Sequence, residues 1–467
     1  MTTAEMAARY SSLVFAELPE PVISRVRDSV LDILGCMVAG RTLPSTTIVA
    51  DLTPDLGGSG HSTAVLGGRV SPPWAGLVNA TSAHGVELDD TDNSASLHPG
   101  NVVIPAALAV AQAVGADGAG AATAIVAGYD AMIRIGRAAG AQSQYERGFH
   151  PTATCGVFGA AVAAGWLLAL DGGQMTRALG IAGSFASGSL EYIDSGAWTK
   201  RLQVGGAVQA GVLAALLAAR DYQGPPTIIE GRFGFLHAYA GSAAVPELTR
   251  GLDEPFAIMG VSVKAFACCR YCQTPVDGLL QLLSRESIEP GTVESIDVGL
   301  VSAGHPIVAE PRHQKLNPRN SVDAQFSLPY SMAVALARRS ASLKDFDAAS
   351  IADPRVRSLM PLVTVHHEDA LDAMYPQSWP ARVCVYLTGG TQAEILLTDC
   401  AGDPSRPLTR EQLRAKFMEL TRDELGGGVA QRVLDMVSRF TQLDDLDELM
   451  DLVAAPGAVP AGAGGMR

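Results

Sequence analysis

The feature that most constrains the fold is a series of Ala- and Gly-rich apolar segments, which short polar loops separate along the first half of the chain. Apolar side chains in residues 20–40 recur near the period of an α-helix. Further helices are predicted at residues 73–86, 102–115, 119–140, 154–170, 174–188 and 204–220. Because Gly and Ala let helices approach closely, we interpret these segments as the buried helices of one tightly packed domain.

The sequence changes character after residue 262. Residues 293–301 partly alternate in the manner of a strand, and residues 382–387 and 392–397 flank the Gly-bearing turn of a predicted hairpin. Helices are predicted again at residues 322–338, 408–420 and 428–453. We therefore expect a mainly α fold, with a large all-helical domain of residues 1–262, completed by 406–455, and a smaller α+β domain of residues 263–405. Residues 456–467 are of low complexity and predict a flexible tail.

Neither a membrane span nor a signal peptide is predicted. The longest apolar runs, residues 155–170 and 204–219, fall short of the roughly 18–20 apolar residues that a spanning helix needs. The first 20 residues include three glutamates and lack the basic start and apolar stretch of a signal peptide. We therefore expect a cytoplasmic protein whose seven cysteines are free thiols.

The charge of the chain restricts its partners. A formal net charge of −14 disfavours nucleic acids and anionic membrane surfaces, because phosphate binding needs dense Lys and Arg. An anionic substrate would need a local cationic pocket that works against the overall field. The sequence lacks GxxxxGK[ST], GxGxxG and GxSxG motifs, so kinase, dinucleotide-binding and α/β-hydrolase functions lose support.

Five polar segments carry the groups that could do chemistry: residues 83–100, 148–154, 198–206, 263–273 and 323–330. Each has an ordinary explanation when taken alone. Acidic loops are mostly solvated surface, the second segment can be a helix that Thr152 or Thr154 caps, the third a basic corner, and the last the start of a packed helix. The three cysteines of the fourth segment lack a convincing fourth ligand for a closed zinc site.

Taken together and in this order, the five segments resemble the MmgE/PrpD family. The family's first motif stands here as Asn79–Ala80, His84, Glu87–Thr91 and His98–Gly100, and its second motif as GFHPTATCGVFGAA at residues 148–161. The later ones contain Lys200–Arg201–Leu202, CCRY at residues 268–271 and QFSLPYS at residues 325–331. The likeness covers roughly residues 5–450, which makes it far more specific than any one motif.

The resemblance implies that the α+β domain is a lid and that the protein is a homodimer. Family members include 2-methylcitrate dehydratase, cis-aconitate decarboxylase and iminodisuccinate epimerase, which act beside carboxylates without an iron–sulfur cluster. We accordingly expect a small-molecule carboxylate substrate, no cofactor and no metal. This sequence departs from the family pattern at Glu87, where Asp is common, and at Gln203 and Gln273, where His is common.

The resemblance also assigns roles to individual residues. Removing a proton beside a carboxylate requires a base of tuned pKa and cations that spread the charge. The predicted catalytic residues are His98, His150, Lys200 and Asp90. The predicted substrate-binding residues are Glu87, Thr91, Arg201, Gln203, Arg270 and Gln273. We expect a lyase of the 2-methylcitrate dehydratase type. A carboxy-lyase, an epimerase and a non-catalytic binding protein are the alternatives.

Overall fold

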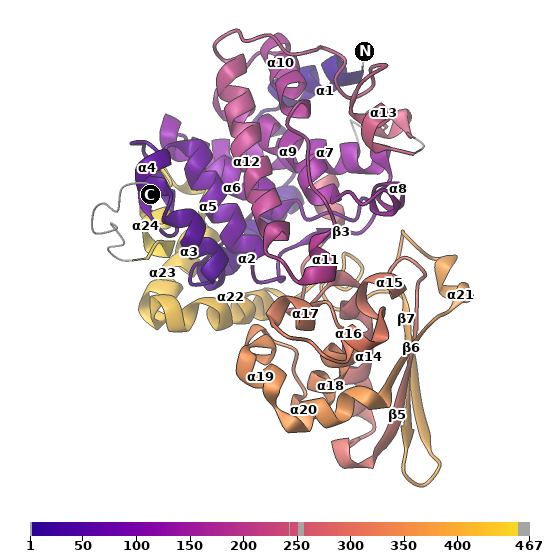
Figure 1. Ribbon diagram of the computed structural model, residues 1–467. Helices are drawn as coiled ribbons and strands as arrows, with labels where there is room; N and C mark the ends of the chain where they lie inside the picture. The colour runs from indigo at the N-terminus through magenta and orange to yellow at the C-terminus, as the bar shows by residue number, and fades with distance from the viewer. Residues whose placement is uncertain (1, 242, 251–255, 456–467) are drawn as a thin grey trace. The chain divides into compact units, whose positions relative to one another are not determined.

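The computed structural model describes residues 2–241, 243–250 and 256–455, which form two compact units (Figure 1). The described residues of Met1–Leu190, Trp198–Val261 and Arg410–Arg467 make up unit 1, and Glu191–Ala197 with Ser262–Thr409 make up unit 2. Helices dominate and the sheets are small, so the prediction of a mainly α fold is confirmed. The predicted tail at 456–467 lies outside the described residues.

The core of unit 1 consists of five helices that match predicted ones. They are α5 (Pro72–His84), α6 (Gly100–Val114), α7 (Gly118–Ala139), α9 (Pro151–Leu167) and α12 (Thr199–Ala218). Helix α9 packs against α6, α7 and α12, and α12 also packs against α5. Small residues are needed where these helices touch. A Cβ on Gly128 of α7 would lie only 2.9 Å from the carbonyl oxygen of Gly159 of α9. Glycine therefore sets how closely the helices of the core can approach.

The remaining helices of unit 1 surround this core. Helix α2 (Glu20–Gly40) packs against α5 and α22 (Arg410–Leu425), and α1 (Thr2–Ser11) packs against α10 (Gly172–Gly183). The end of the chain was predicted as one helical stretch but forms two helices, α23 (Gly427–Ser438) and α24 (Asp447–Val453). Shorter elements are α3 (Pro44–Ala50), α4 (Thr53–Leu56), α8 (Ala141–Glu146), α13 (Phe235–Tyr239) and the antiparallel strands β1 (Ser62–Ala64) and β2 (Gly68–Val70).

One helix of the described ranges, α12, is by itself long and apolar enough to span a membrane. The sequence predicted a shorter apolar helix at residues 204–220. The helix in fact begins five residues earlier, at Thr199. A bent pair formed by α2 with residues Pro44–Leu56 passes the same test only if it is taken as one span. Half of the apolar window of α12 is buried inside unit 1. Core helices of water-soluble proteins have the same length and composition, so the observation carries little weight.

Unit 2 is built on a four-stranded sheet with the order β6–β5–β7–β8. Strands β5 (Val293–Leu300) and β6 (Val363–His367) are parallel, whereas β7 (Ala381–Leu387) is antiparallel to both β5 and β8 (Gln392–Leu397). The predicted hairpin is thus confirmed. Helix α14 (Arg270–Arg285) packs against β7 and β8, and α18 (Leu328–Arg338) packs against β6 and α14 (Figure 1).

The single helix predicted at residues 322–338 is wrong. It is divided into α17 (Ser321–Gln325) and α18, because Ser327 caps a new helix by accepting a hydrogen bond from the Tyr330 amide at 3.1 Å. Pro329, in the first turn of α18, has no amide hydrogen to continue the preceding helix. The other short helices of unit 2 are α11 (Tyr192–Ser195), α15 (His305–Val308), α16 (Arg312–Lys315), α19 (Ala348–Ala352), α20 (Pro354–Leu359) and α21 (Asp369–Asp372).

Candidate active site

Three histidines from different parts of unit 1 lie together. His84 is the last residue of α5, His98 lies in the loop before α6, and His150 is the residue immediately before α9. The ring centre of His84 lies 5.1 Å from that of His98 and 5.9 Å from that of His150. The ends of three core helices thus bring these imidazoles into one group, which we call the histidine cluster. His98 and His150 were predicted as site residues, but His84, which lies between them, was not.

A buried carboxylate, Asp89, links two members of the cluster. One of its oxygens lies 2.8 Å from Nδ1 of His84 and 3.4 Å from Nδ1 of His98, and it accepts a hydrogen bond from the Asn101 amide at 2.5 Å. Ligand atoms of His84, Asp89 and His98 lie within 4.8 Å of one another, so the three could hold a metal ion. Nδ1 of His84 is hydrogen-bonded to Asp89 within this group.

Asp90 acts on His98 through its backbone and not through its side chain. Its carboxylate accepts hydrogen bonds from the Gly100 amide at 2.8 Å and from the Tyr129 hydroxyl at 2.7 Å. Its carbonyl oxygen lies 2.7 Å from Nδ1 of His98, and the Thr91 hydroxyl lies 3.3 Å from the same nitrogen. A carbonyl oxygen can only accept, so Nδ1 of His98 carries a hydrogen. Burial raises the pKa of Asp90 to about 7.

Lys200 and Glu87 form a buried ion pair at the start of α12. Both side chains are almost fully buried, with residue exposures of 7% and 4%. Glu87 adopts a left-handed backbone conformation with φ of 59°, which is unfavourable for a residue with a side chain. We predicted that Lys200 precedes the helix, but it lies in the first turn. Glu87, which we predicted to bind substrate, holds the ammonium group of Lys200 in place.

The surroundings of His84 and His150 favour neutral imidazoles. Burial, followed by the nearby His84, Lys200 and His98, lowers the pKa of His150 well below its usual value. Burial also lowers the pKa of His84, although Asp89 acts in the opposite direction. A buried neutral imidazole can accept a proton near pH 7. The cluster therefore contains a potential base close to a lysine.

Two further predicted residues of α12 have identifiable partners. Oε1 of Gln203 lies 3.0 Å from Nδ1 of His150, so this side chain contacts the cluster directly. The guanidinium of Arg201 is buried and donates to the Ser45 hydroxyl of α3 at 3.0 Å. The charge of Glu87 acts on Arg201, although burial has the larger effect and lowers its pKa.

The threonines of the second polar segment, residues 148–154, do not cap the helix that follows. Neither Thr152 nor Thr154 caps α9, which begins with Pro151 after His150. The Thr152 hydroxyl accepts a hydrogen bond from the backbone of His98 at 3.2 Å, and Thr154 donates to Gln144 at 2.7 Å. Thr152 therefore helps to join the His98 loop to α9, a role that its position in the sequence did not indicate.

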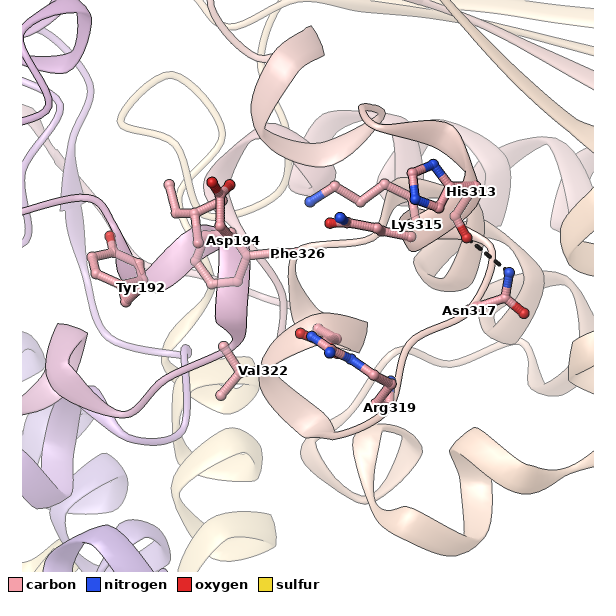
Figure 2. Close-up of a pocket in the computed structure, with 11 residues that line it drawn as sticks. Tyr192, Asp194, His313, Lys315, Asn317, Arg319, Val322 and Phe326 are labelled. Atoms are coloured by element: carbon pink, nitrogen blue, oxygen red, sulfur yellow. Dashed lines mark hydrogen bonds and ion pairs between the residues drawn. The ribbon is translucent and has the colours of Figure 1, made fainter.

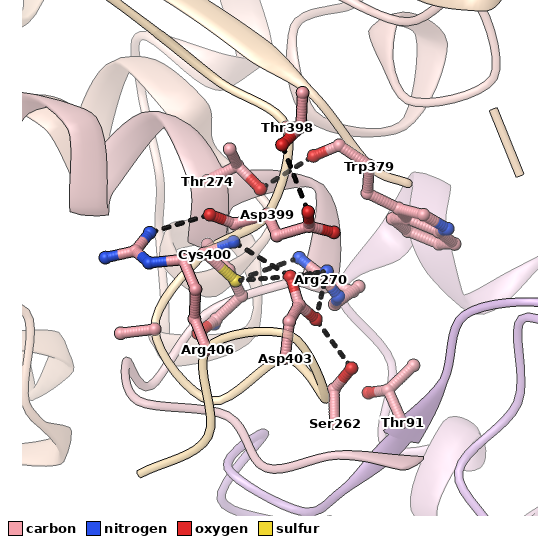
Figure 3. A network of polar contacts seen from close by, with 12 residues as sticks. Thr91, Ser262, Arg270, Thr274, Trp379, Thr398, Asp399, Cys400, Asp403 and Arg406 are labelled. Carbon is pink, nitrogen blue, oxygen red and sulfur yellow. Dashed lines mark hydrogen bonds and ion pairs between the residues drawn. The ribbon is translucent and has the colours of Figure 1, made fainter. Parts of the chain in front are cut away.

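Arg270 and Gln273 belong to unit 2, where both take part in local networks. Arg270 donates to both carboxylate oxygens of Asp403 at 2.8 and 2.9 Å, and Asp403 also accepts from the Ser262 hydroxyl (Figure 3). The amide of Gln273 accepts from the Phe266 backbone at 3.1 Å and donates to the backbone oxygens of residues 266 and 268 at 2.8 and 3.0 Å. These contacts stabilise unit 2, and the predicted binding of substrate by either residue stays a prediction.

The cysteines near Arg270 are buried free thiols. None of the seven cysteines forms a disulfide; Cys268 and Cys269 directly precede α14, and Cys272 lies in its first turn. Burial, with the neighbouring Cys268 as the next cause, raises the pKa of the Cys272 thiol well above its usual value. A thiol that stays protonated is a poor nucleophile and a poor metal ligand.

Unit 2 also contains a cavity of about 280 Å³ that the sequence did not indicate (Figure 2). Lys315 and Arg319 lie on its wall together with the acidic Asp194 and Asp323. Arg319 pairs with Asp323 at 2.9 Å, and the Lys315 ammonium donates to the backbone oxygen of Ile307 at 2.6 Å. Most of its charged groups thus have protein partners, and no residue that we predicted for the site lines it within the described ranges.

Comparison with known proteins identifies relatives over nearly the whole chain. The chain is 26% identical to a cis-aconitate decarboxylase of Aspergillus terreus (strain NIH 2624 / FGSC A1156), over 98% of this chain and 97% of the relative. It is 24% identical to the cis-aconitate decarboxylase of Homo sapiens, over 97% and 95% of the two chains. For the enzyme of the same name from Mus musculus the identity is 25%, over 97% and 93%.

Two family models match consecutive parts of the sequence. The MmgE/PrpD N-terminal domain matches residues 4–247, and the MmgE/PrpD C-terminal domain matches residues 266–442. The first match contains the whole histidine cluster with Asp89, Glu87 and Lys200. The chain therefore belongs to the MmgE/PrpD family.

Proposed function

We propose that this protein is a carboxy-lyase that removes CO2 from a small unsaturated polycarboxylate of the cis-aconitate type. The observation that carries the proposal is the histidine cluster beside the buried Lys200. The relatives named above are all cis-aconitate decarboxylases, and they align with nearly the full length of the chain. This supports decarboxylation better than the dehydration that we expected from the sequence.

The residues of unit 1 meet the chemical needs of such a reaction. When CO2 leaves, the broken carbon–carbon bond leaves its electron pair on the remaining substrate carbon, which must then receive a proton. A cation beside a remaining carboxylate stabilises the developing charge. Lys200, whose ammonium group pairs with Glu87, can supply this cation. Its place in the first turn of α12 adds the positive end of the helix dipole.

The two predicted histidines differ in their surroundings, which suggests different roles. Nδ1 of His98 lies 3.4 Å from the carboxylate of Asp89, an anion that favours the charged form of an imidazole. Burial, followed by the nearby His84, Lys200 and His98, lowers the pKa of His150 well below its usual value. Catalytic sites often hold an acid and a base as two titratable groups whose surroundings differ in this way. We assign to His98 the delivery of a proton to the substrate carbon, and to His150 the uptake of the solvent proton that replaces it.

Dehydration is the second candidate, since an acid and a base could equally remove water from a hydroxy acid. The geometry of the cluster suits both reactions, and the names of the relatives favour the first. Epimerisation and binding without catalysis find no comparable support. The cytoplasmic location, the homodimer and the absence of a membrane or nucleic-acid partner stay predictions.

A substrate screen distinguishes these functions. Purified protein is incubated separately with cis-aconitate, 2-methylcitrate, citrate and iminodisuccinate, and the products are identified by mass spectrometry with a chiral separation. We expect cis-aconitate to lose one CO2. Loss of water from 2-methylcitrate or citrate, without any CO2, would replace the proposal by the hydro-lyase alternative. Inversion of iminodisuccinate at constant mass would replace it by the epimerase.

A further inference from the structure

Two stretches of backbone fix the surroundings of His150. The His150 amide donates to the Gly188 oxygen at 3.2 Å, and the Leu190 amide donates to the Gly148 oxygen at 2.9 Å. Gly188 has a φ of +146°, and a Cβ there would lie 2.9 Å from the Cβ of Ala153. Only glycine fits this close approach without strain. The carbonyl group of Ser189, between these two hydrogen bonds, is therefore held at a defined position beside His150.

Gln203 connects this carbonyl to the imidazole of His150. Its Nε2 donates to the Ser189 oxygen at 2.9 Å, and its Oε1 lies 3.0 Å from Nδ1 of His150. A backbone carbonyl can only accept, so it requires the NH2 group of the amide and turns Oε1 towards the ring. Oε1 has no hydrogen, so the hydrogen in this contact must come from Nδ1 of His150.

We propose that Gln203 is a positioning residue that fixes His150 in the tautomer with the hydrogen on Nδ1. In this tautomer the lone pair of the ring lies on Nε2, which is therefore the ring atom that can accept a proton. The catalytic part of this inference rests on the proposed function, whereas the tautomer itself does not. Gln203, which we predicted to bind substrate, thereby acts through His150.

A neutral amide suits this task because of the charges around His150. The ring faces His84 from α5, Lys200 from α12 and His98 from the loop before α6, and all three disfavour a second proton on it. A carboxylate at position 203 would also accept from Nδ1, but its negative charge would favour the imidazolium. Gln203 therefore selects the tautomer and leaves the ring neutral.

The tautomer can be observed directly by NMR. Protein labelled with 15N-histidine is studied by long-range 1H–15N correlation at pH 7, and the His150 signals are assigned by their loss in His150→Gln. We expect a neutral ring with a protonated Nδ1 and an unprotonated Nε2 in the wild type. Gln203→Leu should give a mixture of tautomers, and Gln203→Glu should shift the titration of His150 to higher pH. The matched control is Gln209→Leu, the same change at a half-buried position of the same helix.

Kinetics test the consequence for turnover. Gln203→Leu should lower kcat by about 10–100-fold, the range found when a hydrogen-bond partner of a functional histidine is removed, with little change in KM. Gln209→Leu should keep the wild-type rate. A wild-type ring protonated on Nε2, or a tautomer that Gln203→Leu leaves unchanged, would overturn the inference. If the tautomer is as proposed but no carboxylate of the screen reacts, the proposed function fails and the assignment of the tautomer stands.

Discussion

At the scale of single residues, the two adjacent carboxylates Asp89 and Asp90 have different tasks. Asp89 contacts two imidazoles, whereas the Asp90 side chain binds a helix amide and a tyrosine. Glu87, with its left-handed backbone, precedes both and changes the direction of the chain. The loop thus presents one carboxylate to the histidine cluster and turns the other towards the structural core.

The raised pKa of Asp90 predicts a specific dependence of stability on pH. Its pKa is about 7 in the folded protein against 3.8 as the reference value, so between these values the folded state holds a proton that the unfolded state releases. The stabilisation that this proton provides is complete below about pH 4 and is lost as pH rises to about 7. Asp90→Asn removes this dependence. Relative to wild type, the variant should become more stable on going from pH 5 to pH 8, by the order of a few kcal/mol.

Urea unfolding at the two pH values measures this difference. The asparagine can still accept from Gly100 through its oxygen, which makes it a conservative replacement for the protonated acid. A difference between variant and wild type that is the same at pH 5 and pH 8 would mean that Asp90 titrates in the folded protein as it does in water.

The ion pair of Lys200 and Glu87 predicts a second effect. Lys200→Met leaves the Glu87 carboxylate buried without its partner, which should lower the free energy of unfolding by about 3–5 kcal/mol. Adding Glu87→Gln should restore most of this stability, because the unpaired charge is removed. Turnover should stay low in both variants, since the substrate cation is missing. Urea unfolding and kinetics of the three proteins test this, and a double variant no more stable than Lys200→Met would argue against the pair.

At the scale of elements, two neighbouring glycines of α12 differ in their surroundings. A Cβ on Gly205 would lie 2.6 Å from the Leu77 oxygen of α5 and would also meet the Thr81 hydroxyl, whereas one on Gly206 would meet nothing within 4 Å. Gly205 therefore sets the distance between α12, which carries Lys200 and Gln203, and α5, which carries His84.

The pair gives a matched test of helix packing. Gly205→Ala should lower the free energy of unfolding by about 1–3 kcal/mol, because an overpacked contact forces the helices apart. Gly206→Ala should leave stability unchanged or raise it by up to about 1 kcal/mol, since Ala favours the helix. Urea unfolding of both variants measures the effects. If Gly205→Ala and Gly206→Ala are equally stable, the separation of α5 from α12 does not lower the free energy of unfolding.

At the scale of the whole molecule, periodicity predicted most of the helices and the hairpin. The pattern of residues 20–40 matches α2, because most of its apolar side chains are buried. The break between α17 and α18 was missed, since Ser327 and Pro329 lie within an otherwise apolar helical pattern. The early start of α12 was missed because Lys200 and Arg201 are buried, which their charge does not suggest.

The site was predicted less completely than the fold, for a physical reason. His98, His150 and Lys200 stand out as polar residues at the ends of apolar segments. The importance of His84 and Asp89 lies in their contacts in space, which join residues from different helix ends and which no pattern in the sequence indicates. The side-chain amide of Gln273 donates hydrogen bonds to nearby backbone oxygens, and no pattern in the sequence indicates such a contact.

The most direct test of the account is the release of labelled CO2 from cis-aconitate with 13C in its carboxyl groups. The rate is measured for the wild type and for His150→Gln, with melting temperatures recorded for both. We predict one CO2 per substrate from the wild type and a rate lower by about 10²–10⁴-fold in the folded variant. A wild type that releases no CO2, or a variant that releases it at the wild-type rate, would contradict the assignment of the histidine cluster as the active site of a carboxy-lyase.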